Sequence, residues 1–263
     1  MNGLLPFFGT KNVRQINSAD VEKWKSTRSA QLSARSYNME ADTLRLILNY
    51  CRDDLRLILD HPAEKLQKRK APKHKAVIPT KEQFLSLVQE MRSPASQNKS
   101  QIAADLTEFM AYSGCRLAEA TQVRWQDVDF ERDVLLITGG DKGTKNHEQR
   151  EIPLFAPLKR VFMKLKGNEG VPRGERIFKI DSAKKAISNA CHRAELPHFT
   201  HHHFRHFFCS NAIEAGVDFK TIAEWLGHKD GGVLAAKTYG HLRAEHSTAM
   251  AKKITFDAAE KDF

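Results

Sequence analysis

The segment that most constrains the fold lies near the end of the chain, at residues 200–241, and reads THHHFRHFFCSNAIEAGVDFKTIAEWLGHKDGGVLAAKTYGH. Its first part predicts a helix over about 202–215. His202 and Arg205 are three residues apart, so imidazole and guanidinium share one helical face and can reach one anion. A neighbouring face carries aromatic side chains that would seat the helix in a core, namely Phe204, Phe207 and Phe208. The chain must therefore hold two basic groups at the edge of a hydrophobic core.

Two further features follow in the same segment. Leu226, Gly227 and His228 form a predicted turn after a second short helix, and a single tyrosine, Tyr239, comes next. Basic groups that bind phosphate, together with one phenol, are the groups needed to form a covalent bond to a phosphodiester. Each feature alone has a plainer interpretation. An isolated His-x-x-Arg is typical of a surface helix, and an isolated tyrosine is typical of a half-buried helix position.

The rest of the chain predicts a mainly helical fold with one small antiparallel sheet. Residues 1–60 contain two amphipathic helical runs, and Ser18 is the predicted cap of the first. Thr80 and Gln83 form a capping box that opens a new domain. Periodicity predicts further helices at 100–113, 157–166, 182–194 and 218–226, and two strands joined by a polar loop at 133–138 and 150–154.

A stretch rich in proline and basic residues separates these parts. Residues 61–79 contain six Lys/Arg and three prolines. Because proline lacks an amide donor and resists helix formation, we predict a linker in this stretch. The predicted organisation is a helical domain over 1–70, a basic linker over 71–79, and a second domain over 80–263 that ends in a C-terminal tail.

The charge of the chain is concentrated near its start. The whole sequence has 42 Lys and Arg against 32 Asp and Glu, a net charge of +10, and residues 1–75 contain 15 basic and 8 acidic side chains. A domain this basic suits a polyanion such as DNA. Charge alone leaves open the alternative of a surface that is basic only for solubility.

Cysteine usage and hydropathy predict a cytoplasmic protein. The four cysteines show no Cys-x-x-Cys spacing and are interpreted as reduced thiols: Cys51, Cys115, Cys191 and Cys209. No apolar run approaches membrane-spanning length, and the first residues lack the pattern of a signal peptide.

Arg116 lies just after a glycine that ends a predicted helix, and taken alone it is best interpreted as a salt-bridge partner of Glu119. The wider pattern is Gly-x-Arg-x-x-Glu, followed by Trp-x-Asp-Val at residues 125–128. It resembles the first arginine box of the tyrosine recombinase (phage integrase) family. The resemblance resumes in family order at the sheet loop, the His-x-x-Arg segment and the tyrosine. It covers about residues 80–245 well and the basic N-terminal part loosely.

The resemblance implies a site-specific DNA recombinase or integrase with a helical DNA-binding domain, short at its N-terminus, and a catalytic domain. Such an enzyme cleaves and rejoins DNA through a covalent 3′-phosphotyrosine, without cofactor or metal. The implied partners are double-stranded DNA attachment sites, a homo-tetramer assembled on DNA, and accessory DNA-bending proteins. Two alternatives stay open: strand relaxation like that of a type IB topoisomerase, and a DNA-binding accessory protein without catalysis.

The family roles transfer to matching positions. Tyr239 is the nucleophile, Arg116 and Arg205 bind the non-bridging phosphate oxygens, and His202 is the base. His228 hydrogen-bonds the phosphate or the tyrosine oxygen. Guanidinium groups suit this role because they donate in a paired, planar fashion to phosphate.

The family also uses a lysine in the sheet hairpin to protonate the leaving 5′ oxygen. Two lysines compete for this role, since counting from Arg116 favours Lys142 and counting back from the second strand favours Lys145. We choose Lys145, because hairpin register is set by the strand that follows. Either lysine could instead be an ordinary loop cation.

Two remaining segments have open interpretations. His202 and His206 have the spacing of metal ligands on a helix, but no His-Glu-x-x-His frame or cysteine pair accompanies them, so no metal is expected. Residues 243–263 could form a short helix with an apolar stripe. Such a tail would dock either on its own domain or, as in the resembling family, on a neighbouring copy, and we expect the latter.

Overall fold

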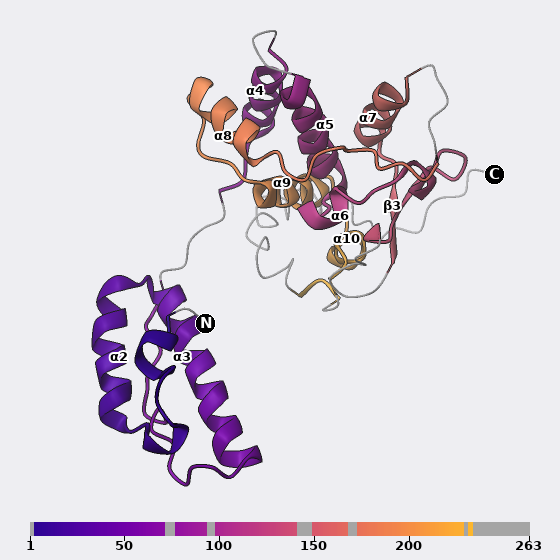
Figure 1. The fold of residues 1–263 in the computed structure, drawn as a ribbon. Helices are drawn as coiled ribbons and strands as arrows, with labels where there is room; N and C mark the ends of the chain where they lie inside the picture. The colour runs from indigo at the N-terminus through magenta and orange to yellow at the C-terminus, as the bar shows by residue number, and fades with distance from the viewer. Residues whose placement is uncertain are drawn as a thin grey trace, which may run out of the picture. The chain divides into compact units, whose positions relative to one another are not determined.

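The computed structural model describes residues 3–71, 77–93, 98–140, 149–167, 173–228 and 231–233. The chain divides into two compact units, Met1–Lys75 and Ala76–Phe263 (Figure 1). The described residues are mostly helical, and the sheet found among them has three short strands. None of the described helices is both long and apolar enough to cross a membrane. The predicted fold class, mainly helical with a small antiparallel sheet, is confirmed.

The first unit is a small helical domain with its own core. Its elements are α1 (Leu5–Phe8), a 3-10 turn (Val13–Gln15), α2 (Ser18–Gln31), α3 (Ala34–Asn49) and a π-helical turn (Tyr50–Asp54). The core centres on Trp24 of α2 and Tyr37 of α3, whose rings stack with centroids 5.2 Å apart. Val21, Leu44 and Leu48 surround this pair. The apolar spacing of the two helices thus brings their inner faces together.

The start of α2 differs from the prediction by one residue. The Asn17 side chain accepts hydrogen bonds from the amides of Ala19 and Asp20 at 3.0 and 3.1 Å, and the Asp20 carboxylate accepts one from the Asn17 amide at 3.2 Å. This reciprocal capping box makes Asn17 the cap. The prediction of Ser18 as the cap was wrong, because Ser18 has no acidic or amide side chain three residues later and occupies the first helical position.

The basic stretch after the π-helical turn packs on the first unit. Ala63 and Leu66 are buried in its core. Arg69 donates to the carbonyls of Ser29 and Leu32 at 2.9 Å each, at the end of α2. These contacts give part of the basic stretch a structural role in the unit.

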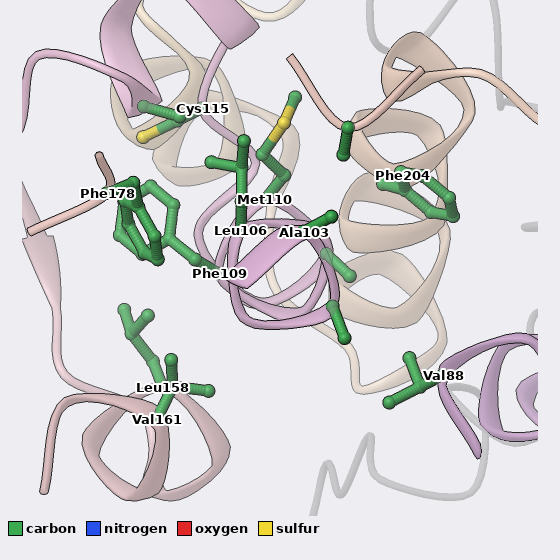
Figure 2. Packing of buried hydrophobic residues seen from close by; sticks show 14 of the residues in the cluster. Val88, Ala103, Leu106, Phe109, Met110, Cys115, Leu158, Val161, Phe178 and Phe204 are labelled. Atoms are coloured by element: carbon green, nitrogen blue, oxygen red, sulfur yellow. The ribbon is translucent and has the colours of Figure 1, made fainter. Parts of the chain in front are cut away.

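The second unit packs its helices around one central helix. Its helices are α4 (Lys81–Met91), α5 (Asn98–Ser113), α6 (Leu117–Ala120), α7 (Ala156–Lys166), α8 (Lys184–Arg193), α9 (His201–Glu214) and α10 (Phe219–Leu226). A 3-10 turn covers Trp125–Asp127. α5 contacts α4, α7, α8 and α9. Figure 2 shows α5 end-on. Its side chains Leu106, Phe109 and Met110 lie among buried side chains that come from the surrounding elements.

The sheet of this unit is antiparallel, with strand order β1 (Val128–Asp129), β2 (Val134–Ile137), β3 (Arg150–Pro153). Leu135 faces Ile152 and Ile137 faces Arg150 in the β2–β3 register. The two predicted strands correspond to β2 and β3. β1 was not predicted, because two residues are too few to show a period of two.

The predicted helices of this unit are confirmed as α5, α7, α8, α9 and α10, with ends that differ by at most two residues. The capping box at α4 is confirmed as well. The Gln83 amide donates to the Thr80 hydroxyl at 3.2 Å, and the Thr80 amide donates to the Gln83 side chain at 3.0 Å. Local propensity and tertiary packing therefore agree in these elements.

Gly114 determines how the central helix meets α9 and α10. It follows the last residue of α5 and adopts a φ of +66°, in the left-handed region that favours glycine. A Cβ at this position would lie 2.6 Å from the Phe208 ring and 2.7 Å from Leu226. Only glycine therefore lets α9 and α10 approach the turn that leads into Arg116.

Candidate active site

Arg205 lies at the centre of the candidate site. One terminal nitrogen donates to the carbonyl of Gly114 at 2.7 Å, and the other donates to the carbonyl of Leu226 at 2.7 Å and to Nε2 of His228 at 2.9 Å. The residue is only 6% exposed. Burial, and then the nearby charge of Arg116, lower the pKa of Arg205 to about 10. The guanidinium stays protonated at neutral pH, and it joins α9 to the turn after α5 and to the end of α10.

The contact with Arg205 defines the protonation of His228. A guanidinium can only donate, so Nε2 of His228 must accept and the ring proton of the neutral form lies on Nδ1. The turn that holds this ring is built by the end of α10. Gly227 adopts a φ of +65°, and the amide of His228 donates to the Ala223 carbonyl at 2.9 Å. Leu-Gly-His is therefore a helix C-cap that presents the imidazole to Arg205.

Arg116 forms the predicted contact with Glu119. Its side chain donates to Oε1 at 2.9 Å, and its backbone amide donates to Oε2 at 3.0 Å. The two side chains differ in exposure, with Arg116 at 29% and Glu119 at 3%. The plainer interpretation of Arg116 as a salt-bridge residue is thus present, and it leaves the guanidinium partly open to solvent.

Arg150, at the start of β3, is a residue of this region whose role sequence reasoning missed. Its Nη2 donates to Oε2 of Glu119 at 2.6 Å, and its Nε donates to the carbonyl of Trp225 at 2.7 Å. The side chain is 9% exposed. A signal existed, because an arginine opening a short strand that is otherwise half apolar must find buried acceptors.

His202 lies on the same helix as Arg205. Burial, and then the nearby charges of Arg205, His203 and Arg116, lower the pKa of His202. Its ring meets that of His206 edge-on, with centroids 4.5 Å apart. His202 is consequently neutral at neutral pH and can accept a proton.

The neighbouring histidines have local structural roles. Nε2 of His201 accepts a hydrogen bond from the Ala183 amide at 3.0 Å, and Nδ1 of His203 accepts one from the Thr200 amide at 2.8 Å. A ring nitrogen that accepts from an amide is not offered to a metal ion. Among the described residues, no group of three His, Cys, Asp or Glu side chains could hold a metal.

The histidine cluster predicts acid sensitivity of folding. Burial, and then the charge of His202, lower the pKa of His206 from 6.5 to about 4. Between these values the unfolded chain binds a proton that the folded chain does not, so the free energy of unfolding falls as pH drops through this window. We expect His206→Gln to reduce the acid-induced loss of stability by about 1–2 kcal/mol. Urea unfolding at several pH values measures the slope.

His192→Gln is the matched control for this experiment, because His192 is exposed on α8. It should leave the pH slope unchanged. Equal slopes for wild type and the His206 variant would contradict the assignment of the acid sensitivity to His206.

The structure brings four predicted site residues together: Arg116, His202, Arg205 and His228. The predicted nucleophile Tyr239 and the candidate lysines Lys142 and Lys145 lie outside the described residues, as does the predicted tail at 243–263. Their roles stay predictions.

The sequence of this chain is similar to a known protein family and to known proteins. A family model described as the phage integrase family matches residues 78–246. A tyrosine recombinase XerC from Xanthomonas campestris pv. campestris (strain B100) is 26% identical over 267 residues, which cover 95% of this chain and 76% of the relative. A tyrosine recombinase XerA from Thermococcus onnurineus (strain NA1) is 26% identical over 197 residues, covering 71% of this chain and 66% of the relative.

Solved structures share the fold over nearly the whole chain. The Tn1549 transposon integrase in complex with a circular intermediate DNA aligns with a TM-score of 0.73 at 17% identity, covering 96% of this chain and 92% of the integrase chain. A lambda integrase dimer bound to a COC′ core site aligns with a TM-score of 0.71 at 16% identity, covering 99% of this chain and 72% of that chain.

Proposed function

The chain belongs to the phage integrase family, and on that premise we propose how its residues cleave and rejoin DNA. It is a site-specific DNA recombinase of the tyrosine type. One observation carries the assignment of the site. Arg205 contacts Gly114 and His228, which are 91 and 23 residues away in the chain, so three separate sequence boxes converge on one guanidinium.

Arg116 and Arg205 bind the non-bridging oxygens of the scissile phosphate. The contacts of Arg205 with Gly114, Leu226 and His228 use three of the five N–H groups of a guanidinium. The transition state places additional negative charge on the phosphate oxygens, and fixed cations in a largely buried site stabilise it without reorganisation. The Arg116 side chain, being partly exposed, is the more accessible of the two to an incoming phosphate.

Tyr239 supplies the attacking oxygen. A bond forms between the phenolic oxygen and phosphorus while the bond from phosphorus to the 5′ oxygen breaks. A phenol with a pKa of about 10 is ionised to about one part in a thousand at neutral pH, so it needs a base. His202 takes the phenolic proton, which its lowered pKa permits because the ring is neutral.

Lys145 delivers the proton that the leaving 5′ oxygen requires. We expect Lys145→Ala to slow cleavage by about 100-fold, as is typical for loss of a general acid. A substrate with a 5′-bridging sulfur, whose leaving group needs no proton, should restore the rate of this variant. Rescue of Lys142→Ala in place of Lys145→Ala would move the role to Lys142.

The covalent 3′-phosphotyrosine retains the energy of the broken strand. A 5′-hydroxyl from another strand attacks the same phosphorus, which releases the tyrosine and reseals the DNA without ATP.

A pool of nicked duplexes with randomised arms tests this function, because the pool samples many candidate target sequences at once. The nick lets the short fragment that carries the freed 5′-hydroxyl diffuse away, so the cleaved strand cannot be resealed, stays attached to the protein and survives denaturation. We expect the attached strands to be enriched in one sequence. Attachment without enrichment would indicate topoisomerase-like strand relaxation, and no attachment would contradict the proposal.

We further propose that the first unit, Met1–Lys75, holds DNA through its basic surface while the second unit cleaves it. Double-stranded attachment sites are the DNA partner, four copies assemble on them, and accessory DNA-bending proteins take part. Affinity governed by phosphate contacts should fall steeply with salt.

Residues 243–263 are proposed to join the copies by docking on a neighbour. An apolar groove of about 400 Å³ in the second unit supports this role, since its lining includes Phe84, Tyr112, Phe155, Phe208 and Trp225. A chain that ends at Leu242 should bind one DNA site but sediment without the tetramer peak. Normal tetramer assembly by the truncated chain would contradict the docking proposal.

A further inference from the structure

Arg150 has no place in the chemistry described above, yet its guanidinium is among the most constrained charged groups near the site. It is the first residue of β3 and pairs across the sheet with Ile137. Its side chain is 9% exposed and donates from two nitrogens of the guanidinium, from Nη2 to Glu119 at 2.6 Å and from Nε to the Trp225 carbonyl at 2.7 Å. A buried charge held in this way fixes the segments that it joins.

The first of these segments carries Arg116. Glu119 uses both carboxylate oxygens: Oε1 accepts from the Arg116 side chain, and Oε2 is shared by the Arg116 amide and Arg150. Burial raises the pKa of Glu119, but the hydrogen bond and charge of Arg150, together with the hydrogen bonds from the Arg116 amide and side chain, outweigh it and leave the pKa below its usual value. The ionised carboxylate is therefore held by two arginines, and its orientation determines where the Arg116 guanidinium lies.

The second segment carries His228. Arg150 donates to the carbonyl of Trp225, near the end of α10, and its side chain lies against the next turn. A Cβ on Gly227 would come within 3.1 Å of a terminal nitrogen of Arg150 and 3.3 Å of its Cδ. The side chain of Arg150 thus packs on the backbone that precedes His228.

We propose that Arg150 is a positioning residue that aligns Arg116 with His228 by bridging Glu119 and the C-terminus of α10. The proposal rests on the proposed function, since it takes the task of Arg116 to be binding the scissile phosphate. Arg150 acts through Glu119 and touches no substrate.

Two substitutions test this role. Arg150→Gln removes the charge. Arg150→Lys keeps it, but a single ammonium cannot donate to Glu119 and Trp225 in the planar geometry of a guanidinium. Both variants should form the covalent adduct about 30-fold more slowly on a phosphodiester, within the range seen when a residue that orients a functional group is removed. The lysine variant keeps a cation beside the buried carboxylate of Glu119. It can therefore be measured even if the glutamine variant does not fold.

Modified substrates separate positioning from a general loss of structure. In a methylphosphonate, a methyl group replaces one non-bridging oxygen and removes the negative charge that Arg116 must meet. The rate ratio of wild type to Arg150→Lys should then shrink to under about fivefold, because correct placement of Arg116 matters less. A 5′-bridging sulfur should leave the ratio at its phosphodiester value, since protonation of the leaving group is not the step affected.

The control is Arg132→Lys. Arg132 is 64% exposed and contacts Glu151, the neighbour of Arg150 on the same strand. Its variant should match wild type on every substrate. If Arg150→Lys also matches wild type, or if its ratio is the same on phosphodiester and methylphosphonate, the positioning role is overturned. Absence of adduct with the wild-type protein would instead count against the proposed function itself.

Discussion

Replacing Tyr239 with phenylalanine is expected to abolish the covalent protein–DNA adduct while DNA affinity stays within about threefold. The substitution removes one oxygen and leaves the ring, so the chain keeps its basic surface and loses only the attacking atom. Loss of a nucleophile reduces the rate by many orders of magnitude, and here we expect at least about 10⁴-fold. Adduct yield on nicked attachment DNA, separated under denaturing conditions, measures the effect.

Tyr50→Phe is the matched control for this prediction. Tyr50 is 54% exposed in the first unit and is therefore the tyrosine there most open to solvent among the described residues. Its variant should form adduct at the wild-type rate. Adduct formation by Tyr239→Phe at the wild-type yield would remove Tyr239 as the nucleophile, and with it the phosphotyrosine mechanism.

Replacing Arg205 with lysine is the second substitution expected to have a large effect. Arg205 donates to Gly114, Leu226 and His228 at 2.7, 2.7 and 2.9 Å, from two nitrogens of one plane. A lysine ammonium is a single point and cannot reach all three acceptors at once. We expect adduct formation to slow by about 10³-fold, as is typical for loss of a fixed donor to a developing oxyanion.

The same substitution should also lower stability. Two carbonyls and one ring nitrogen lose a donor in a buried place, which we expect to reduce the free energy of unfolding by about 2–4 kcal/mol. Urea unfolding measures this loss. The rate of adduct formation is measured at a temperature below the onset of thermal unfolding, so that the loss of stability does not contribute to the rate effect. Arg193→Lys, at a half-exposed arginine bound to Glu90, should change neither quantity. A rate within tenfold of wild type for Arg205→Lys would contradict the central place given to Arg205.

Local sequence patterns were enough to predict the longer helices of the second unit and the strands β2 and β3, but not the short helix α6 or the two-residue strand β1. The aromatic face of α9, with Phe204, Phe207 and Phe208 all buried, follows from helical spacing alone. The glycine stop after α5 and the capping box at Thr80 are equally local signals, since each depends on residues within a few positions. His202 and Arg205 share a helix for the same reason.

Contacts between distant segments could not be predicted in this way. Arg150 meets Glu119 and Trp225, which are 31 and 75 residues away, and no periodicity encodes such pairs. The Arg116–Glu119 contact, by contrast, is local and could be predicted from its spacing of three residues. The spacing does not predict that the Glu119 carboxylate also accepts a hydrogen bond from the side chain of Arg150 in β3.

The misplaced cap of α2 has a local cause. Ser18 and Asn17 are both good capping residues, and the choice between them depends on which one has a reciprocal partner three residues later. Asn17 has Asp20, and Ser18 has Val21. The strand β1 was missed because the pairing of Val128 with Leu135 depends on the turn between them.

The central claim is that one tyrosine forms the bond to DNA, and mapping the attached residue tests it most directly. After the adduct is digested with trypsin and nuclease, the peptide covering residues 238–243 should carry a nucleotide through a phosphotyrosine at Tyr239. The peptides that contain the other three tyrosines, Tyr37, Tyr50 and Tyr112, should be unmodified. A nucleotide found on any of those peptides, or on a serine, would contradict the account.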